Sequence, residues 1–130
     1  MTNSLLVGKL IYATIQNSEE VKSKVGDKVY PIVAPADTTF PFIVYTRANA
    51  YPSTHTKDGW FGDNASFQIT IVSDKYFDSA EIANDVRDLF ENCRISNNDL
   101  CIDNIRMTSA SEAFSEDTFT QTLYFECDAQ

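Results

Sequence analysis

The sequence predicts an α+β fold: an antiparallel sheet of four to five strands with two main helices packed on one face, in the order α-β-β-α-β-β. Apolar residues recur at helical spacing in two segments and alternate in several others, which indicates helices and half-buried strands. The 130 residues, 43% of them hydrophobic and 22% charged, are enough for one core, so we expect a single domain over residues 1–130.

The first helix is expected over residues 4–17, because an apolar stripe follows one side at 3.6 residues per turn. The segment 19–27 is polar and ends in Gly-Asp, and no helix or strand is predicted there. Residues 28–33 form a short extended piece, which Pro31 and Pro35 should confine to an edge of the sheet.

Two strands are expected over residues 41–47 and 65–72, where β-branched and aromatic residues are frequent. The segment between them, residues 48–64, is longer than a tight hairpin needs and is rich in aromatic residues. Long loops in compact domains are often functional. We therefore take it as a candidate subunit-interface loop, with candidate residues Tyr51, His55, Lys57, Asp58, Trp60 and Phe61.

The second helix is expected over residues 80–90. Asp78 and Glu81 have the spacing of a capping box, and Phe77 and Ile82 that of a hydrophobic staple. The acidic residues of this helix should form a solvated outer face.

The last two strands are expected over residues 100–108 and 118–128, joined by a polar connection over residues 109–117. Edge strands expose unpaired backbone groups, which gives a physical route to self-assembly. The candidate contacts at the tip of this hairpin are Glu112, Phe114 and Glu116.

The net charge of −9 is unevenly distributed. Residues 1–73 hold 6 Lys and Arg against 6 Asp and Glu, whereas residues 74–130 hold 4 against 13. An acidic chain repels phosphate backbones, so sequence-specific nucleic-acid binding is not expected. Solubility explains the charge adequately. The alternative is an acidic DNA mimic or inhibitor that binds a basic partner.

No pattern of catalytic or cofactor-binding residues emerges. Cys93, Cys101 and Cys127 match no zinc or redox spacing and are expected to be free thiols, and no glycine cluster forms a phosphate-binding loop. We expect no cofactor, no metal, no enzymatic activity and no membrane-spanning segment. A small-ligand enzyme using Tyr51, His55 and Trp60 is a weaker alternative.

Several ordered blocks resemble the tail completion proteins of long-tailed bacteriophages. They are Val-Gly-Asp-Lys-Val-Tyr-Pro at residues 25–31, Ala-Pro at 34–35, Phe-Pro-Phe-Ile-Val-Tyr at 40–45, Asp-Gly at 58–59, the strand beginning Phe-Gln-Ile at residue 67 and the helix at 80–90. The resemblance covers nearly the whole chain up to residue 92, and the hairpin beyond it is included by position only.

This resemblance implies a structural virion assembly protein without catalytic residues. Such a tail terminator typically closes as a ring homo-oligomer, possibly a hexamer, on the tail tube and joins it to the head connector. The implied partners are further copies of the chain, a tail tube protein and a head connector protein. The implied location is the virion tail and, during assembly, the cytoplasm of the host bacterium.

Overall fold

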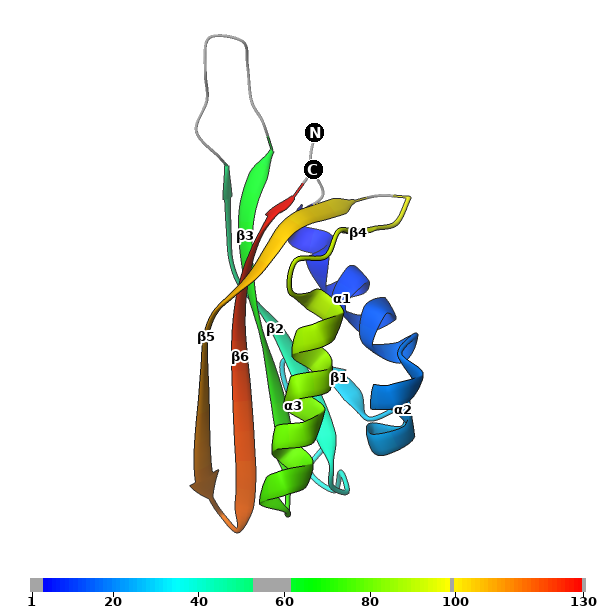
Figure 1. Cartoon of the computed structure of the whole chain (residues 1–130), viewed down its shortest axis with the longest axis vertical. Coiled ribbons are helices and arrows are strands. Elements are labelled where there is room, and N and C mark those ends of the chain that lie inside the picture. Colours follow the sequence, from blue (N-terminus) through cyan, green and yellow to red (C-terminus); the bar gives the residue numbers. More distant parts are fainter. Residues whose placement is uncertain (1–3, 53–61, 99, 130) are drawn as a thin grey trace, which may run out of the picture.

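The computed structural model describes residues 4–52, 62–98 and 100–129, and places a six-stranded sheet beside three α-helices (Figure 1). The α+β class is therefore confirmed. The helical elements are η1 (Ser4–Leu6), α1 (Val7–Gln16), α2 (Glu19–Val25) and α3 (Tyr76–Phe90). The strands are β1 (Val29–Pro31), β2 (Phe42–Pro52), β3 (Asp63–Ser73), β4 (Ile95–Ser96), β5 (Cys101–Ser115) and β6 (Thr118–Ala129).

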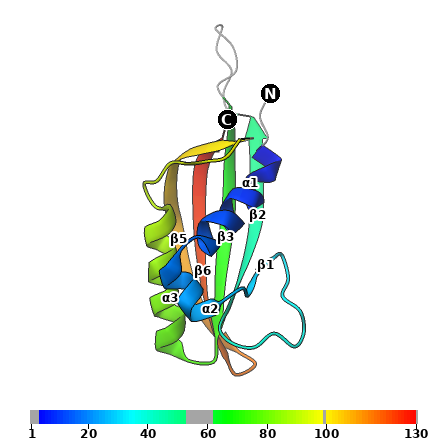
Figure 2. The ribbon, with the colours of Figure 1, turned by 90° about the vertical axis from the view of Figure 1, so that its right-hand side faces the viewer.

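The strand order is β1-β2-β3-β6-β5-β4, and all the helices lie on one face of the sheet (Figure 2). The sheet is mixed, because β1 runs parallel to β2 while the other neighbouring pairs are antiparallel. The prediction of four to five antiparallel strands in the order α-β-β-α-β-β was thus wrong in detail. The short extended piece expected at residues 28–33 is confirmed as the edge strand β1. The strand β4, at the other edge, was not expected, because a strand of two residues carries little periodic signal in a sequence.

The first predicted helix is confirmed as η1 and α1, but the segment after it also forms a helix. In α2, the Ser18 hydroxyl caps the first turn by accepting from the amide of Val21 at 3.4 Å. Val21 and Val25 lie one turn apart and are buried, and Gly26 ends the helix at a φ of 62°. This helix was not predicted from the sequence.

The predicted capping box of α3 was also wrong, because the helix begins earlier, at Tyr76. Lys75 is the N-cap residue and makes no side-chain cap. Asp78 lies inside the first turn, where its negative charge interacts favourably with the positive end of the helix dipole. Phe77 is 76% exposed, so it forms no hydrophobic staple.

The two ends of the segment predicted as a long loop are strand, since β2 continues to Pro52 and β3 begins at Asp63, and residues 53–61 between them lie outside the described residues. Similarly, the predicted connection 109–117 is mostly strand. β5 pairs with β6 up to Ser115, and a two-residue turn joins them. The side chains of this segment are mostly short and polar, so its sequence has no apolar alternation that would predict a strand. Backbone pairing with β6 stabilises the strand instead.

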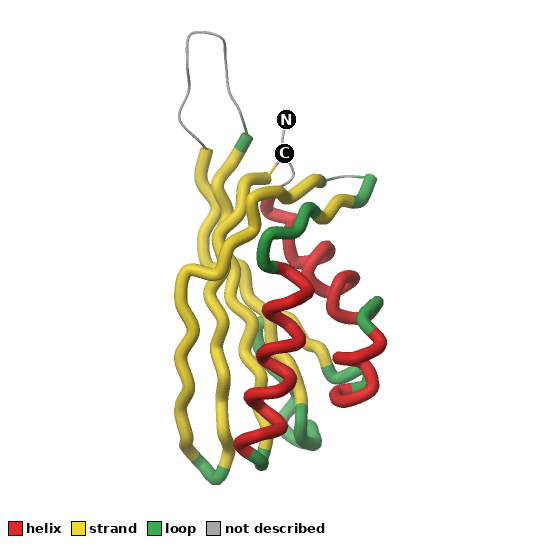
Figure 3. The backbone as a smooth tube through the Cα atoms, viewed as in Figure 1, coloured by secondary structure: helices red, strands yellow, loops and turns green. Residues whose placement is uncertain are grey.

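The core fills the space between the sheet and the helices. Phe67 of β3, Phe90 of α3 and Phe125 of β6 are fully buried, and the Phe67 and Phe125 rings stack with centroids 5.2 Å apart. Alternate residues of β3 and β6 face this core, so their neighbours face the other side of the sheet, which no described helix covers (Figure 3). No described helix is both long and apolar enough to span a bilayer.

Candidate assembly surface

The hairpin of β5 and β6 extends along α3 to the end of the molecule where α3 begins (Figure 1). Two irregularities in β5, between Asp103 and Arg106 and between Met107 and Ser109, accompany a bend in the strand (Figure 3). Beyond the bend, β5 continues as a regular strand to Ser115. Beyond the bend, Glu112 of β5 contacts Tyr76 in the first turn of α3.

Glu112 of β5 is bonded to both neighbouring elements. Its carboxylate accepts from the Tyr76 hydroxyl of α3 at 2.9 Å and from the Gln121 amide of β6 at 3.0 Å. These hydrogen bonds, that of Gln121 first, lower the pKa of Glu112, and the bond from Tyr76 raises the pKa of that phenol. The predicted tip residue Glu112 therefore orients the hairpin on α3 and remains ionised at neutral pH.

An aromatic cluster covers the same end. Phe114 packs on Phe119 with ring centroids 4.8 Å apart, and Tyr76 packs edge-on against Phe119 and Phe77. Phe114 is nevertheless 59% exposed. The cluster borders a cavity of about 270 Å³, which Glu112 and Gln121 also line. Large exposed apolar side chains gathered in one place are typical of a protein contact surface.

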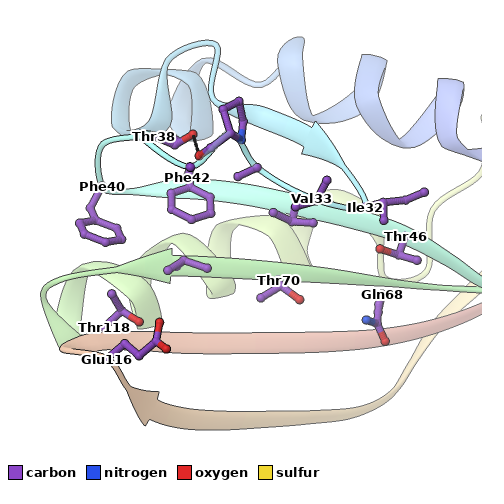
Figure 4. A pocket seen from close by; sticks show the side chains of 15 residues that line it. Ile32, Val33, Thr38, Phe40, Phe42, Thr46, Gln68, Thr70, Glu116 and Thr118 are labelled. Atoms are coloured by element: carbon purple, nitrogen blue, oxygen red, sulfur yellow. Dashed lines mark hydrogen bonds between the residues drawn. The ribbon is translucent and has the colours of Figure 1, made fainter.

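A second hollow, of about 500 Å³, lies on the face of the sheet opposite the helices (Figure 4). Phe42, Val44 and Val72 contribute its apolar floor, and the segment after β1 forms one wall. In that wall, Ile32 and Val33 are 74% and 73% exposed, and Ile32 has a φ of 67°. A β-branched residue in the left-handed region is unusual, because its side chain crowds the backbone.

At each edge of the sheet, a short outermost strand pairs with only part of the longer strand next to it. β1 covers β2 only at Ile43–Tyr45, and β4 covers β5 only at Cys101 and Ile102. The amide of Asn92 also donates to the carbonyl of Ile105, next to that covered part of β5. Among the described residues, no strand pairs with the outer edges of Thr46–Pro52 or Met107–Ser115.

The predicted site residues fall in three places. Tyr51 lies near the end of β2 and is 51% exposed, whereas His55, Lys57, Asp58, Trp60 and Phe61 lie outside the described residues. Glu112 and Phe114 face α3, and Glu116 lies in the turn, lining the hollow on the other face. Sequence reasoning missed Tyr76 and Phe77. The available signal was this adjacent aromatic pair, which precedes the predicted helix 80–90.

The cysteines are free thiols in the structure. Cys127 is buried in the core, where burial raises its pKa to about 12, so it serves as a small apolar side chain. Arg94 donates to the Cys101 sulfur at 3.2 Å. Within the described ranges, no group of histidine, cysteine or carboxylate side chains could hold a metal ion.

This combination defines a class of protein: a small α+β subunit whose prominent surface features are open strand edges and exposed aromatic side chains. Residues 9–129 match the family model described as tail completion protein gp17. The chain belongs to this family and is therefore a structural protein of the phage tail. No curated protein matches the chain in sequence.

Solved structures share the fold at low sequence identity. A chain from a structure described as the virion of a native gene transfer agent particle superposes with a TM-score of 0.77 at 16% identity, over 98% of this chain and 94% of that chain. A second chain superposes with a TM-score of 0.62 at 15% identity, over 95% of each chain.

Proposed function

We propose that this protein closes as a ring on the end of the phage tail tube and joins the tail to the head connector. The observation that carries the proposal is membership of the tail completion family over residues 9–129. The fold is consistent with it, because two different open edges at opposite sides of one sheet suit head-to-tail contacts between copies. The residue range 1–130 acts as one domain in this proposal.

The contact residues in this proposal are those at the two ends of the sheet. Tyr51, together with His55, Lys57, Asp58, Trp60 and Phe61, would meet a neighbouring protein at one end, and Glu112, Phe114 and Glu116 at the other. The acidic second half of the chain would keep packaged DNA from adhering to the inner wall of a ring, because like charges repel.

Deletion of the gene from the phage or prophage that carries it tests the joining role. The expected result is full heads beside separate tails in electron micrographs, with infectivity restored by the wild-type chain supplied in trans. Joined and infectious particles without the gene product would contradict the proposal. Native mass measurement over a concentration series tests the ring separately.

The second candidate is an acidic DNA mimic or inhibitor, which the net charge of −9 favours. However, several of the carboxylates are engaged within the chain. Asp85 binds Lys24 at 2.6 Å, Glu91 binds Arg87 at 2.6 Å and Glu126 binds Arg106 at 3.1 Å. A mimic would bind a basic protein with an affinity that falls steeply with salt, and would leave head-to-tail joining intact.

A further inference from the structure

We infer that the free edge of β5, Met107–Ser115, pairs with the free edge of β2, Thr46–Pro52, of a second copy of the chain, so that one sheet continues from subunit to subunit. This inference rests on the ring proposed above and names its contact. The chemistry of the site is that of an unpaired strand: a row of backbone amide donors and carbonyl acceptors that another strand can satisfy.

Beyond the irregularity between Met107 and Ser109, the β5 edge is a regular strand that lacks two of the usual protections against pairing. Natural edge strands are commonly blunted by lysine, by proline or by a cover of other elements. The sequence Met-Thr-Ser-Ala-Ser-Glu-Ala-Phe-Ser at residues 107–115 contains no lysine and no proline. By contrast, β1 at the other side is three residues long and ends at Pro31. The β1 edge is thus protected, whereas the β5 edge carries neither residue and the free part of β2 has a proline only at its last position, Pro52.

Along the strand direction, the two free segments lie toward opposite ends of the sheet. Thr46 of β2 lies level with Ser109 of β5, through the cross-strand partners Gln68 and Tyr124. The free part of β2 extends from this level in one direction, and the free part of β5 extends mainly in the other. Pairing them staggers neighbouring subunits, and a stagger of this kind is what a closed, tilted barrel of strands requires.

The strand directions and charges also agree. Three antiparallel pairings separate β2 from β5, so the two strands run in opposite directions. Copies related by an axis along the strands would therefore pair β5 with β2 in the antiparallel sense. Each free segment carries a single charge, Arg47 on β2 and Glu112 on β5, and these are opposite. Both side chains also have hydrogen-bond partners in their own subunit, since Arg47 donates to the Leu5 carbonyl at 3.0 Å, so the charges favour the pairing without requiring a direct ion pair. Pairing two β5 edges or two β2 edges would instead bring like charges together.

Disulfide trapping tests the contact directly. Cys93→Ser and Cys101→Ser provide the background, in which the buried Cys127 remains. Asn49→Cys is placed on one preparation and Ser111→Cys on another, with Ala113→Cys as an alternative register. Under mild oxidation, we expect covalent dimers when the two preparations are mixed, and none from either preparation alone. A chain carrying both substitutions should give a ladder of higher multimers.

A substitution at the edge gives a second test. Ser111→Lys should weaken self-association about tenfold, because a lysine on the edge opposes strand pairing. The matched control is Thr122→Lys on β6, the cross-strand partner of Ser111, which is already paired on both sides. Association is read from native mass and sedimentation, and circular dichroism verifies that both variants fold.

The outcomes separate this inference from the proposed ring. Oligomers that form without any cross-link in the mixture overturn the strand pairing and leave the ring standing. Covalent dimers from Ser111→Cys alone show that two β5 edges meet, which also overturns it. A protein that stays monomeric at all concentrations contradicts both proposals. A cross-link from Ser111→Cys to a different tail protein, with none between copies of this chain, would overturn the inference and assign the β5 edge to that partner.

Discussion

Tyr76 and Glu112 are hydrogen-bonded at 2.9 Å, although 36 positions separate them in the chain. The bond joins the first residue of α3 to the part of β5 that lies beyond the bend. It therefore holds the far end of the hairpin in a defined position relative to the helix. Since the same end bears the exposed Phe114, this bond also determines how that side chain is presented.

Tyr76→Phe should loosen the end of the hairpin without unfolding the core. Glu112 loses one of its two side-chain donors, so the pKa of its carboxyl should rise toward the ordinary glutamate range. The carboxyl can be titrated by NMR, and amide exchange of residues 110–115 should become faster. Tyr124→Phe, on the uncovered face of the sheet, is the control. An unchanged Glu112 titration would show that the bond does not form in solution.

The same carboxylate predicts a pH dependence. Because the pKa of Glu112 is lower in the folded chain than in the unfolded chain, its contribution to stability is present at neutral pH. It is lost as the pH falls through the ordinary glutamate range to the lower folded value. The difference in stability between wild type and Glu112→Gln should therefore shrink on acidification.

Urea unfolding between about pH 7 and pH 3 measures this difference. Glu116→Gln removes a similar charge from the turn and reports the general effect of charge on an acidic chain. A wild-type advantage that stays constant down to the lowest pH would mean that Glu112 is not preferentially ionised in the folded state.

Local patterns predicted most of the fold, and tertiary context explains the rest. The stripe of α1 and the alternation in β3 and β6 follow directly from residue spacing. The length of β5 was underestimated, because its second half is polar and is stabilised by pairing with β6. α2 was recoverable in principle, since Ser18 and Gly26 flank Val21 and Val25 at helical spacing.

Only part of the candidate surface could be predicted, again because local patterns do not contain tertiary contacts. Glu112 and Phe114 were identified from their place in a hairpin. Tyr76 was not, because its role depends on the bend in β5 that brings residue 112 to the helix. Likewise, Ile32 and Val33 are exposed although apolar residues are expected to be buried, because they lie in the turn beyond β1. Spacing in a sequence contains no information about such long-range placement.

Two adjacent residues of β3 should respond differently to the loss of one methyl group. Ile69 is fully buried against the helices, so Ile69→Val should cost about 1 kcal/mol of stability. Thr70 faces the hollow on the other side, and Thr70→Ser should cost about half as much. Chemical denaturation of both variants measures the difference. Equal costs would indicate that the uncovered face is as tightly packed as the core.

The turn of the hairpin should be improvable. Glu116 and Asp117 both have positive φ, 51° and 61°, as in the two-residue turns that normally favour asparagine and glycine. Asp117→Gly removes the steric cost of this conformation and should stabilise the chain by about 0.5 kcal/mol, after the larger entropy loss of glycine on folding. Asp117→Asn removes the charge but keeps a Cβ atom at the positive φ, and should therefore change stability less. Thermal unfolding of both variants separates backbone from charge effects, and a Gly variant no more stable than the Asn variant would show that the turn relaxes in solution.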